Sequence, residues 1–238
     1  MCIFTHQKYR NMHILVLSGD EMATEFSQKF PEGANGNTYT FLHSRHLTDD
    51  QLKPSDIVFD FTLHAEPERL CHYPPDQVVF CQAVTKQLAA LVQESGLENT
   101  CTLFGFNGLP TLLNRNVLEV SLYKQSDAEK LHQVCEQLGT DYQVVDDRAG
   151  MATPRILCMI INEACYTLQE GTASIQDIDL GMKLGTNYPH GPFEWANAIG
   201  IANVYKVLEA MYEDTKEERY KICPLLRTKY LRGEKFEL

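Results

Sequence analysis

The sequence predicts a doubly wound α/β sheet in the first part of the chain and an all-α domain in the second. Up to residue 148, short apolar runs alternate with helical segments, a pattern typical of a mostly parallel sheet covered by helices. Beyond that point only helical periodicity remains, for example at Ile156, Ile160 and Ala164. We therefore place the two domains at residues 12–148 and 149–238.

The first domain contains seven apolar runs of strand length, and helical segments separate several of them. The segment at 126–138 begins with Ser126 as a predicted N-cap and has Glu129 three residues later, as in a capping box. The predicted strands cover residues 13–18, 38–42, 56–61, 77–81, 100–106, 117–123 and 142–146, and the predicted helices cover 20–30, 85–95 and 126–138.

The second domain is organised around the turn between Gly185 and Trp195, where two glycines and two prolines separate long apolar-periodic segments. Pro192 occupies a position typical of the first residue of a helix. Upstream, Ser174 is a predicted N-cap with Asp177 at the capping-box position. The predicted helices cover residues 155–170, 176–184, 192–212 and 224–232.

The overall charge and the apolar content limit the classes of function. With 238 residues, a net charge of −11 and a hydrophobic content of 44%, the chain can bury a full core. The negative charge argues against nucleic-acid binding and against docking on an anionic membrane. No apolar run is long enough to span a bilayer, and the first residues do not resemble a signal peptide, although Met12 could be an alternative start.

Cysteine usage indicates a reducing compartment. The eight cysteines are scattered without a Cys-x-x-Cys pair, and Cys81, Cys101 and Cys158 fall within apolar runs. Buried thiols in a cytoplasmic protein are therefore expected, rather than disulfides or a metal site. We also find no Ser-His-Asp, metal-ligand or phosphate-loop pattern.

Four motifs of the second domain occur in the order and near the spacing of a known family. They are Gly150-Met-Ala-Thr-Pro-Arg-Ile-Leu, Ile161-Asn-Glu-Ala, Glu170-Gly-Thr-Ala-Ser-Ile-Gln-Asp-Ile-Asp and Met182-Lys-Leu-Gly-Thr-Asn-Tyr-Pro-His-Gly-Pro-Phe-Glu. This stretch resembles the C-terminal domain of the 3-hydroxyacyl-CoA dehydrogenases. The resemblance implies a Rossmann-like N-terminal domain, NAD as cofactor, 3-hydroxyacyl-CoA oxidation in fatty-acid metabolism, and a homodimer formed through the helical domain.

The family's catalytic pair carries over only in part. The Glu that orients the catalytic His matches Glu119, but the His position itself holds Phe104, whose ring cannot transfer a proton. Asn107 matches the family's Phe-Asn-Pro segment, whereas Pro154 stands where an Asn is expected. We expect Glu119 to face the apolar Phe104 ring, with the general base lost.

The cofactor motif also departs from the family pattern. The turn that should read Gly-x-Gly-x-x-Gly begins at Ser18, followed by Gly19, and places Asp20 where the backbone should approach the pyrophosphate. Met22 anchors this alignment. At the end of the second strand His43 replaces the ribose-binding acid, and Arg45 could meet a 2′-phosphate. We expect NAD affinity to be weak or lost, since a carboxylate repels phosphate.

Three functions remain open. The first is a degenerate, non-catalytic, dimeric member of the family with a binding or regulatory role, for which an acyl-CoA is a candidate ligand. The second is an active NAD(P)-dependent oxidoreductase on an acyl-CoA or hydroxy acid, with His190 or His64 as a replacement base. The third is a structural partner of another enzyme.

Overall fold

The computed structural model describes residues 11–42, 55–96 and 101–238. Its centre is a seven-stranded sheet with the order β2-β1-β3-β4-β5-β6-β7. All neighbouring strands are parallel except β5 and β6, which run antiparallel. The strands are β1 His13–Leu17, β2 Thr38–Leu42, β3 Ile57–Asp60, β4 Val78–Gln82, β5 Thr102–Phe106, β6 Val117–Leu122 and β7 Asp141–Val145.

Helices cover both faces of this sheet, which confirms the predicted doubly wound architecture. On one face, α1 (Asp20–Lys29) and α4 (Ala128–Leu138) pack on the sheet through Phe26 and Leu131. On the other face α3 (Leu88–Ser95) packs through Leu88 and Leu91. Buried apolar strands with helices on each side are what a parallel sheet requires.

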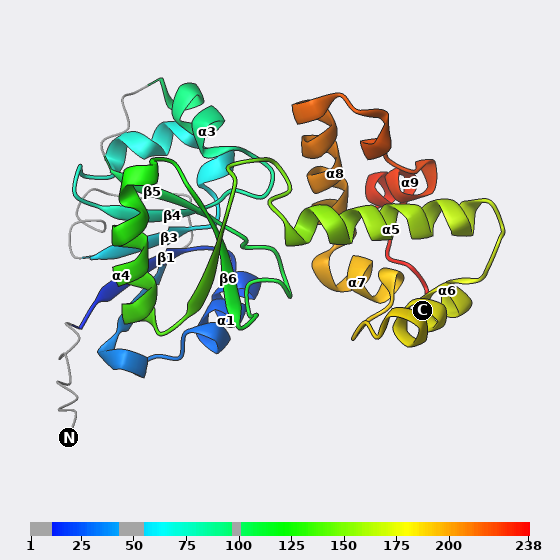
Figure 1. Ribbon diagram of the computed structural model, residues 1–238, viewed down its shortest axis with the longest axis horizontal. Helices are drawn as coiled ribbons and strands as arrows, with labels where there is room; N and C mark the ends of the chain where they lie inside the picture. Colours follow the sequence, from blue (N-terminus) through cyan, green and yellow to red (C-terminus); the bar gives the residue numbers. More distant parts are fainter. Residues whose placement is uncertain (1–10, 43–54, 97–100) are drawn as a thin grey trace.

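The remaining helices form a separate all-α group beside the sheet (Figure 1). They share one core, in which buried apolar side chains of the first helix meet those of the later ones. The helices are α5 Thr153–Gln169, α6 Ile175–Thr186, α7 Pro192–Ile199, α8 Ile201–Thr215 and α9 Pro224–Arg232. The predicted domain boundary at residues 148 and 149 falls between β7 and α5.

The turn between α6 and α7 is held by a buried acid. Asp179 of α6 accepts hydrogen bonds from the backbone N–H groups of Phe193 at 2.8 Å and Glu194 at 3.1 Å, which satisfies the first donors of α7. A Cβ on Gly191 would lie 2.4 Å from the Asp179 Cβ, so this close approach requires glycine. Pro192 begins α7 as predicted.

The predicted N-caps have different outcomes. Ser174 Oγ accepts from the Asp177 N–H at 3.1 Å, so the predicted N-cap is confirmed. The Asp177 carboxylate accepts from the Ser174 hydroxyl at 2.6 Å instead of from the Ser174 N–H that a capping box would use. The prediction at Ser126 is wrong, because residues 125–127 form a 3-10 turn and α4 begins at Ala128 without a side-chain cap.

Two other predicted helices have different boundaries. The single helix expected at 192–212 is wrong: Gly200, with φ +95°, separates α7 from α8. The helix expected from residue 85 begins at Leu88, because Asp147 beyond β7 accepts hydrogen bonds from the N–H groups of Leu88 at 2.8 Å and Ala89 at 3.1 Å. This cap comes from a residue far along the chain.

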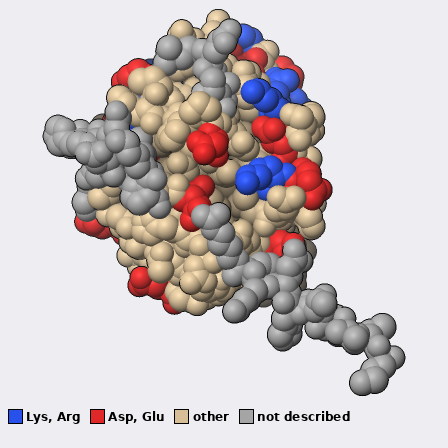
Figure 2. Space-filling model, turned by 90° about the vertical axis from the view of Figure 1, so that its left-hand side faces the viewer, with Lys and Arg blue, Asp and Glu red and all other residues tan. Residues whose placement is uncertain are grey.

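The surface of the sheet domain carries charges of both signs. Figure 2 shows the face of the sheet domain that lies away from the helical group, where acidic and basic side chains stand beside one another among the residues drawn in colour. Within the described part of the chain, no helix combines the length and apolar content needed to cross a bilayer.

Candidate functional site

Glu119 in β6 connects the sheet to the helical group. Its carboxylate accepts hydrogen bonds from the N–H groups of Ala152 and Thr153, the latter at 3.1 and 3.2 Å, and the side chain is buried. These donors belong to the start of α5, where backbone N–H groups lack helical partners and carry partial positive charge. Glu119 is therefore the N-terminal cap of α5, supplied by a strand.

Asn107 lies beside Glu119. It directly follows β5, and its Nδ2 donates a long hydrogen bond to Glu119 Oε2 at 3.5 Å. Together they border a hollow of about 320 Å³ that also includes Arg115 and Gln143. The two residues that survive from the family motif are thus brought together.

Phe104 lies on the other face of the sheet, so the expectation that Glu119 faces its ring is wrong. Phe104 pairs with Leu122 across the antiparallel strands, three residues from Glu119. Alternation along a strand places positions three apart on opposite faces. Phe104 is fully buried, with its ring centroid 5.1 Å from that of Phe80, in a cluster that excludes Glu119.

On the face of the sheet that carries Glu119, the neighbouring strand β5 leaves no room for a side chain at Gly105. A Cβ on Gly105 would lie 2.3 Å from Ser121 Oγ and 2.6 Å from the Ala83 Cβ. Ser121 Oγ is buried without a hydrogen-bond partner among the described residues. Shifting the motif by one position would therefore not bring an imidazole next to Glu119.

The turn between β1 and α1 departs from a phosphate cradle. Gly19, where an added Cβ would have nothing within 4 Å, is the N-cap of α1, and the exposed Asp20 and Glu21 are its first two residues. Asp20 therefore does not cap the helix, although its charge complements the helix dipole. Ser18 Oγ is buried without a partner among described residues, and Met22 packs on the sheet core.

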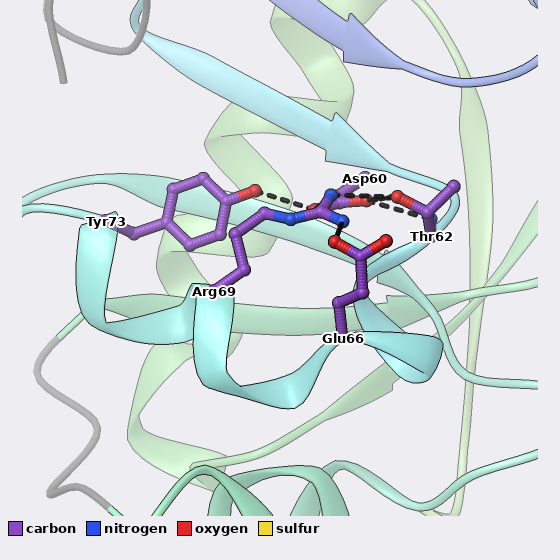
Figure 3. A network of polar contacts seen from close by, with 5 residues as sticks. All are labelled: Asp60, Thr62, Glu66, Arg69 and Tyr73. Carbon is purple, nitrogen blue, oxygen red and sulfur yellow. Dashed lines mark hydrogen bonds and ion pairs between the residues drawn. The ribbon is translucent and has the colours of Figure 1, made fainter. Parts of the chain in front are cut away.

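A buried polar network lies at the carboxyl end of β3, next to β1 (Figure 3). Asp60 is fully buried and accepts from Arg69 Nη1 at 3.0 Å, Tyr73 Oη at 2.7 Å and the Thr62 N–H at 2.8 Å. Burial and the adjacent Asp60 carboxylate raise the pKa of Tyr73 well above its usual value, so its hydroxyl stays a donor. Arg69 also pairs with Glu66.

This network holds the segment that follows β3 in place. The segment contains only two short 3-10 turns, Leu63–Ala65 and Pro67–His72, where a doubly wound fold usually has a full helix. This site was not predicted from the sequence. A buried strand ending in Asp, followed nine residues later by Arg in a segment without periodicity, was the available signal.

The two alternative bases lie in different surroundings. His64 is mostly buried after β3, and its Nδ1 has no hydrogen-bond partner among the described residues. Burial lowers the pKa of His64, with Asp60 opposing this effect and Lys86 and Lys206 adding to it. His190 is 57% exposed, and its Nδ1 lies 3.7 Å from Glu194 Oε2.

Other predicted site residues can now be placed or set aside. Pro154 is buried in the first turn of α5. His43 and Arg45 lie outside the described residues. Cys81, Cys101 and Cys158 are buried free thiols, as expected, and burial raises the pKa of Cys101 to about 11. Across the described ranges, no group of three or more His, Cys, Asp or Glu side chains is placed to hold a metal ion.

Comparisons with known proteins agree with this geometry. Residues 150–236 match the family model for the C-terminal domain of 3-hydroxyacyl-CoA dehydrogenase. The chain is 42% identical over 102 residues to 3-hydroxyadipyl-CoA dehydrogenase of Escherichia coli, covering 43% of this chain and 22% of the relative. It is 39% identical over 90 residues to 3-hydroxybutyryl-CoA dehydrogenase of Bradyrhizobium diazoefficiens, covering 38% and 31%. The chain thus matches less than a third of each relative's length.

A solved structure extends the likeness to the whole fold. The crystal structure of (S)-3-hydroxybutyryl-CoA dehydrogenase PaaH1 from Ralstonia eutropha superimposes with a TM-score of 0.73, covering 94% of this chain and 95% of that chain at 19% identity. The fold of this chain is therefore a Rossmann-like sheet followed by an all-α domain. Residues 150–236, less than half of the chain, are similar to the C-terminal domain of the 3-hydroxyacyl-CoA dehydrogenases.

Proposed function

We propose that this chain is a non-catalytic member of the family that keeps the two-domain scaffold as a dimeric binding or regulatory module. One observation carries the proposal. The carboxylate that would orient a catalytic His caps α5 instead, and the matching His position is a buried Phe on the opposite face. No imidazole of the described residues stands beside Glu119 to take a proton from a substrate hydroxyl, and losing a general base costs roughly 10²–10⁴-fold in rate.

Weak or absent NAD binding is part of this proposal. A pyrophosphate at the start of α1 would meet two carboxylates, Asp20 and Glu21, in the first helical turn. Asp20 also places a side chain at the position where the backbone should approach the pyrophosphate. Charge is a further obstacle, since like charges a few ångströms apart repel by about 1 kcal/mol even in bulk water and more near a protein surface. The residues present therefore do not fit a bound dinucleotide.

A dimer through the helical part is supported by exposed apolar side chains. Leu184 is 77% exposed and Leu180 is 53% exposed, both on α6. Beside them an apolar hollow of about 360 Å³ lies between α5 and α6, bordered by Ile160, Ala164 and Met182. Contiguous exposed apolar surface is typical of a protein interface. We infer that a second copy covers this face.

The test of the proposal measures NADH oxidation with acetoacetyl-CoA. We expect no turnover by the native chain. A kcat on the order of 10 s⁻¹ would overturn the proposal. The Glu119→Gln variant is the matched control, because turnover that persists in it would come from a contaminant or another site.

Light scattering of the native chain and of Leu184→Glu measures the dimer, which the variant should weaken.

A second candidate is an active oxidoreductase that uses His64 as its base. The observation that favours it is the buried Nδ1 without a partner among described residues, on an imidazole whose lowered pKa keeps it neutral and able to accept a proton. His64 follows β3, where sites of α/β sheets collect. Saturable NAD(P) binding by calorimetry, with turnover lost in His64→Ala, would support this candidate. Absence of binding would exclude it.

A further inference from the structure

A pocket of about 400 Å³ lies between the loop that follows β5, one side of α5 and the turn that leads into α7. It adjoins the hollow at Glu119, and Leu112, Arg115 and Thr153 border both, but Glu119 and Asn107 do not line it. We propose that this pocket binds a small apolar carboxylate, with Arg115 holding the carboxylate and aliphatic and aromatic walls holding the apolar body.

The walls provide an apolar surface, part of which extends beyond the core of the helical group. Ile156 is 62% exposed, yet it and Ile160 line the pocket from α5. Opposite them, Tyr188 and Trp195 pack against each other with ring centroids 5.3 Å apart. Pockets of this size that combine apolar and aromatic walls with a few polar groups are typical small-molecule sites.

Two side chains of the pocket wall can carry a positive charge, Arg115 and His190, and of these Arg115 is always charged. Its guanidinium is exposed and makes no ion pair or hydrogen bond within the described part of the chain, in a protein of net charge −11. Glu194, next to Trp195 in the sequence, is already paired, because it accepts from Lys183 Nζ at 2.6 Å and from the Gly191 N–H at 2.9 Å. A planar guanidinium binds a carboxylate through two parallel hydrogen bonds.

The loop that carries Arg115 is held in position before any ligand binds. Glu25 of α1 accepts hydrogen bonds from the N–H groups of Thr111 at 2.8 Å and Asn114 at 3.0 Å. Lys29 of the same helix donates to the Arg115 carbonyl. A pre-positioned loop lowers the ordering cost of binding. This favours a specific site over a transient surface contact.

The chain has one tryptophan, Trp195, so its fluorescence reports directly on this pocket. We would titrate the full chain with hexanoate and, separately, with its neutral isostere hexanamide. The expected result is a saturable fluorescence change in which hexanoate binds at least about ten-fold more tightly than hexanamide. Equal affinity for the two probes, or no saturable change with hexanoate, would overturn the proposal.

Two substitutions make the test specific to Arg115. Arg115→Ala should weaken hexanoate binding about ten-fold and leave hexanamide binding unchanged. Arg227→Ala removes an exposed guanidinium on α9 that does not line the pocket, so it should bind hexanoate as the native chain does. Native-like hexanoate binding by Arg115→Ala would contradict the assignment. The result does not depend on NADH turnover, so this proposal and the proposed function can fail separately.

Discussion

Glu119 in β6 accepts two hydrogen bonds from the backbone N–H of Thr153 in α5, at 3.1 and 3.2 Å. One side chain of the sheet thereby fixes where the helical group begins. This contact gives the buried Glu119 carboxylate a structural role. Its present role is to satisfy the start of a helix at the junction of sheet and helices.

Replacing Glu119 should therefore destabilise the fold even if the chain has no activity. We expect Glu119→Ala to lower the free energy of unfolding by roughly 2 kcal/mol, since a cap and charge-assisted hydrogen bonds are lost. Glu119→Gln keeps an acceptor oxygen and should cost less. Urea denaturation measures both. Glu129→Ala, at an exposed position on α4, is the control and should change stability by less than about 0.5 kcal/mol.

Restoring the missing imidazole should not restore the reaction. In Phe104→His the ring would enter the aromatic cluster on the face opposite Glu119. We expect no NADH oxidation with acetoacetyl-CoA and a stability loss of about 1–3 kcal/mol, because a polar ring replaces a buried phenyl. Phe104→Leu, which keeps the site apolar, serves as the packing control. Turnover gained in Phe104→His alone would show that Glu119 and position 104 can face each other.

Two glycines in the helical group should respond to alanine in opposite directions. Gly200 has φ +95°, which alanine adopts only with strain, so Gly200→Ala should cost more than about 1 kcal/mol. Gly181 lies inside α6 with nothing within 4 Å of an added Cβ, so Gly181→Ala should stabilise by about 0.5–1 kcal/mol. Thermal unfolding at one protein concentration compares them. Equal shifts would mean that Gly200 does not break the helix.

This pair also shows what sequence reasoning could and could not find. Apolar runs and helical periodicity located all seven strands and most helices, because those patterns arise directly from burial. A single Gly inside a periodic stretch does not by itself indicate a positive φ, so the break at Gly200 was missed. The cap of α3 by Asp147 was missed for another reason. Asp147 lies 59 positions after Leu88 and 58 positions after Ala89, and a local sequence pattern does not indicate such a distant contact.

The resemblance to the family predicted some residues of the candidate site but not their contacts. The motifs singled out Glu119 and Asn107 separately, and the structure brings the two side chains within 3.5 Å of each other. They could not indicate the new partner of Glu119, because a resemblance transfers the role of a residue in its relatives rather than its contacts in this chain. The same limit applies to the network at Asp60, whose partners lie in a segment without periodicity.

Stability should fall when His64 becomes protonated. Burial lowers its pKa, so between that lowered value and about 6.5 the unfolded chain binds more protons than the folded one. The stability that the neutral His64 allows is therefore fully present above about pH 6.5, and it is lost as the pH falls through this window. The groups acting on the imidazole include Asp60, which opposes the shift, and Lys86 and Lys206, which add to it.

Thermal unfolding at pH 7.5 and at pH 5.5 measures this effect. The other acid-sensitive groups are the same in every variant, so a difference between variants reports on His64. We expect the native chain to lose more thermal stability between these values than His64→Gln does. His132→Gln is the control, since His132 is exposed on α4. If His64→Gln and the native chain show the same pH dependence, the imidazole is not held in its neutral form.

The network at the carboxyl end of β3 should be the most sensitive polar site in the sheet domain. Arg69→Met leaves the fully buried Asp60 carboxylate without its cation, and breaking a buried pair in this way costs about 3–5 kcal/mol. Asp60→Asn together with Arg69→Met removes the charge as well as its partner. The double variant should therefore be less destabilised than the sum of the two single variants, as measured by urea denaturation. Strict additivity would mean that Arg69 and Asp60 act independently, and that the short 3-10 turns after β3 are held by their apolar contacts alone.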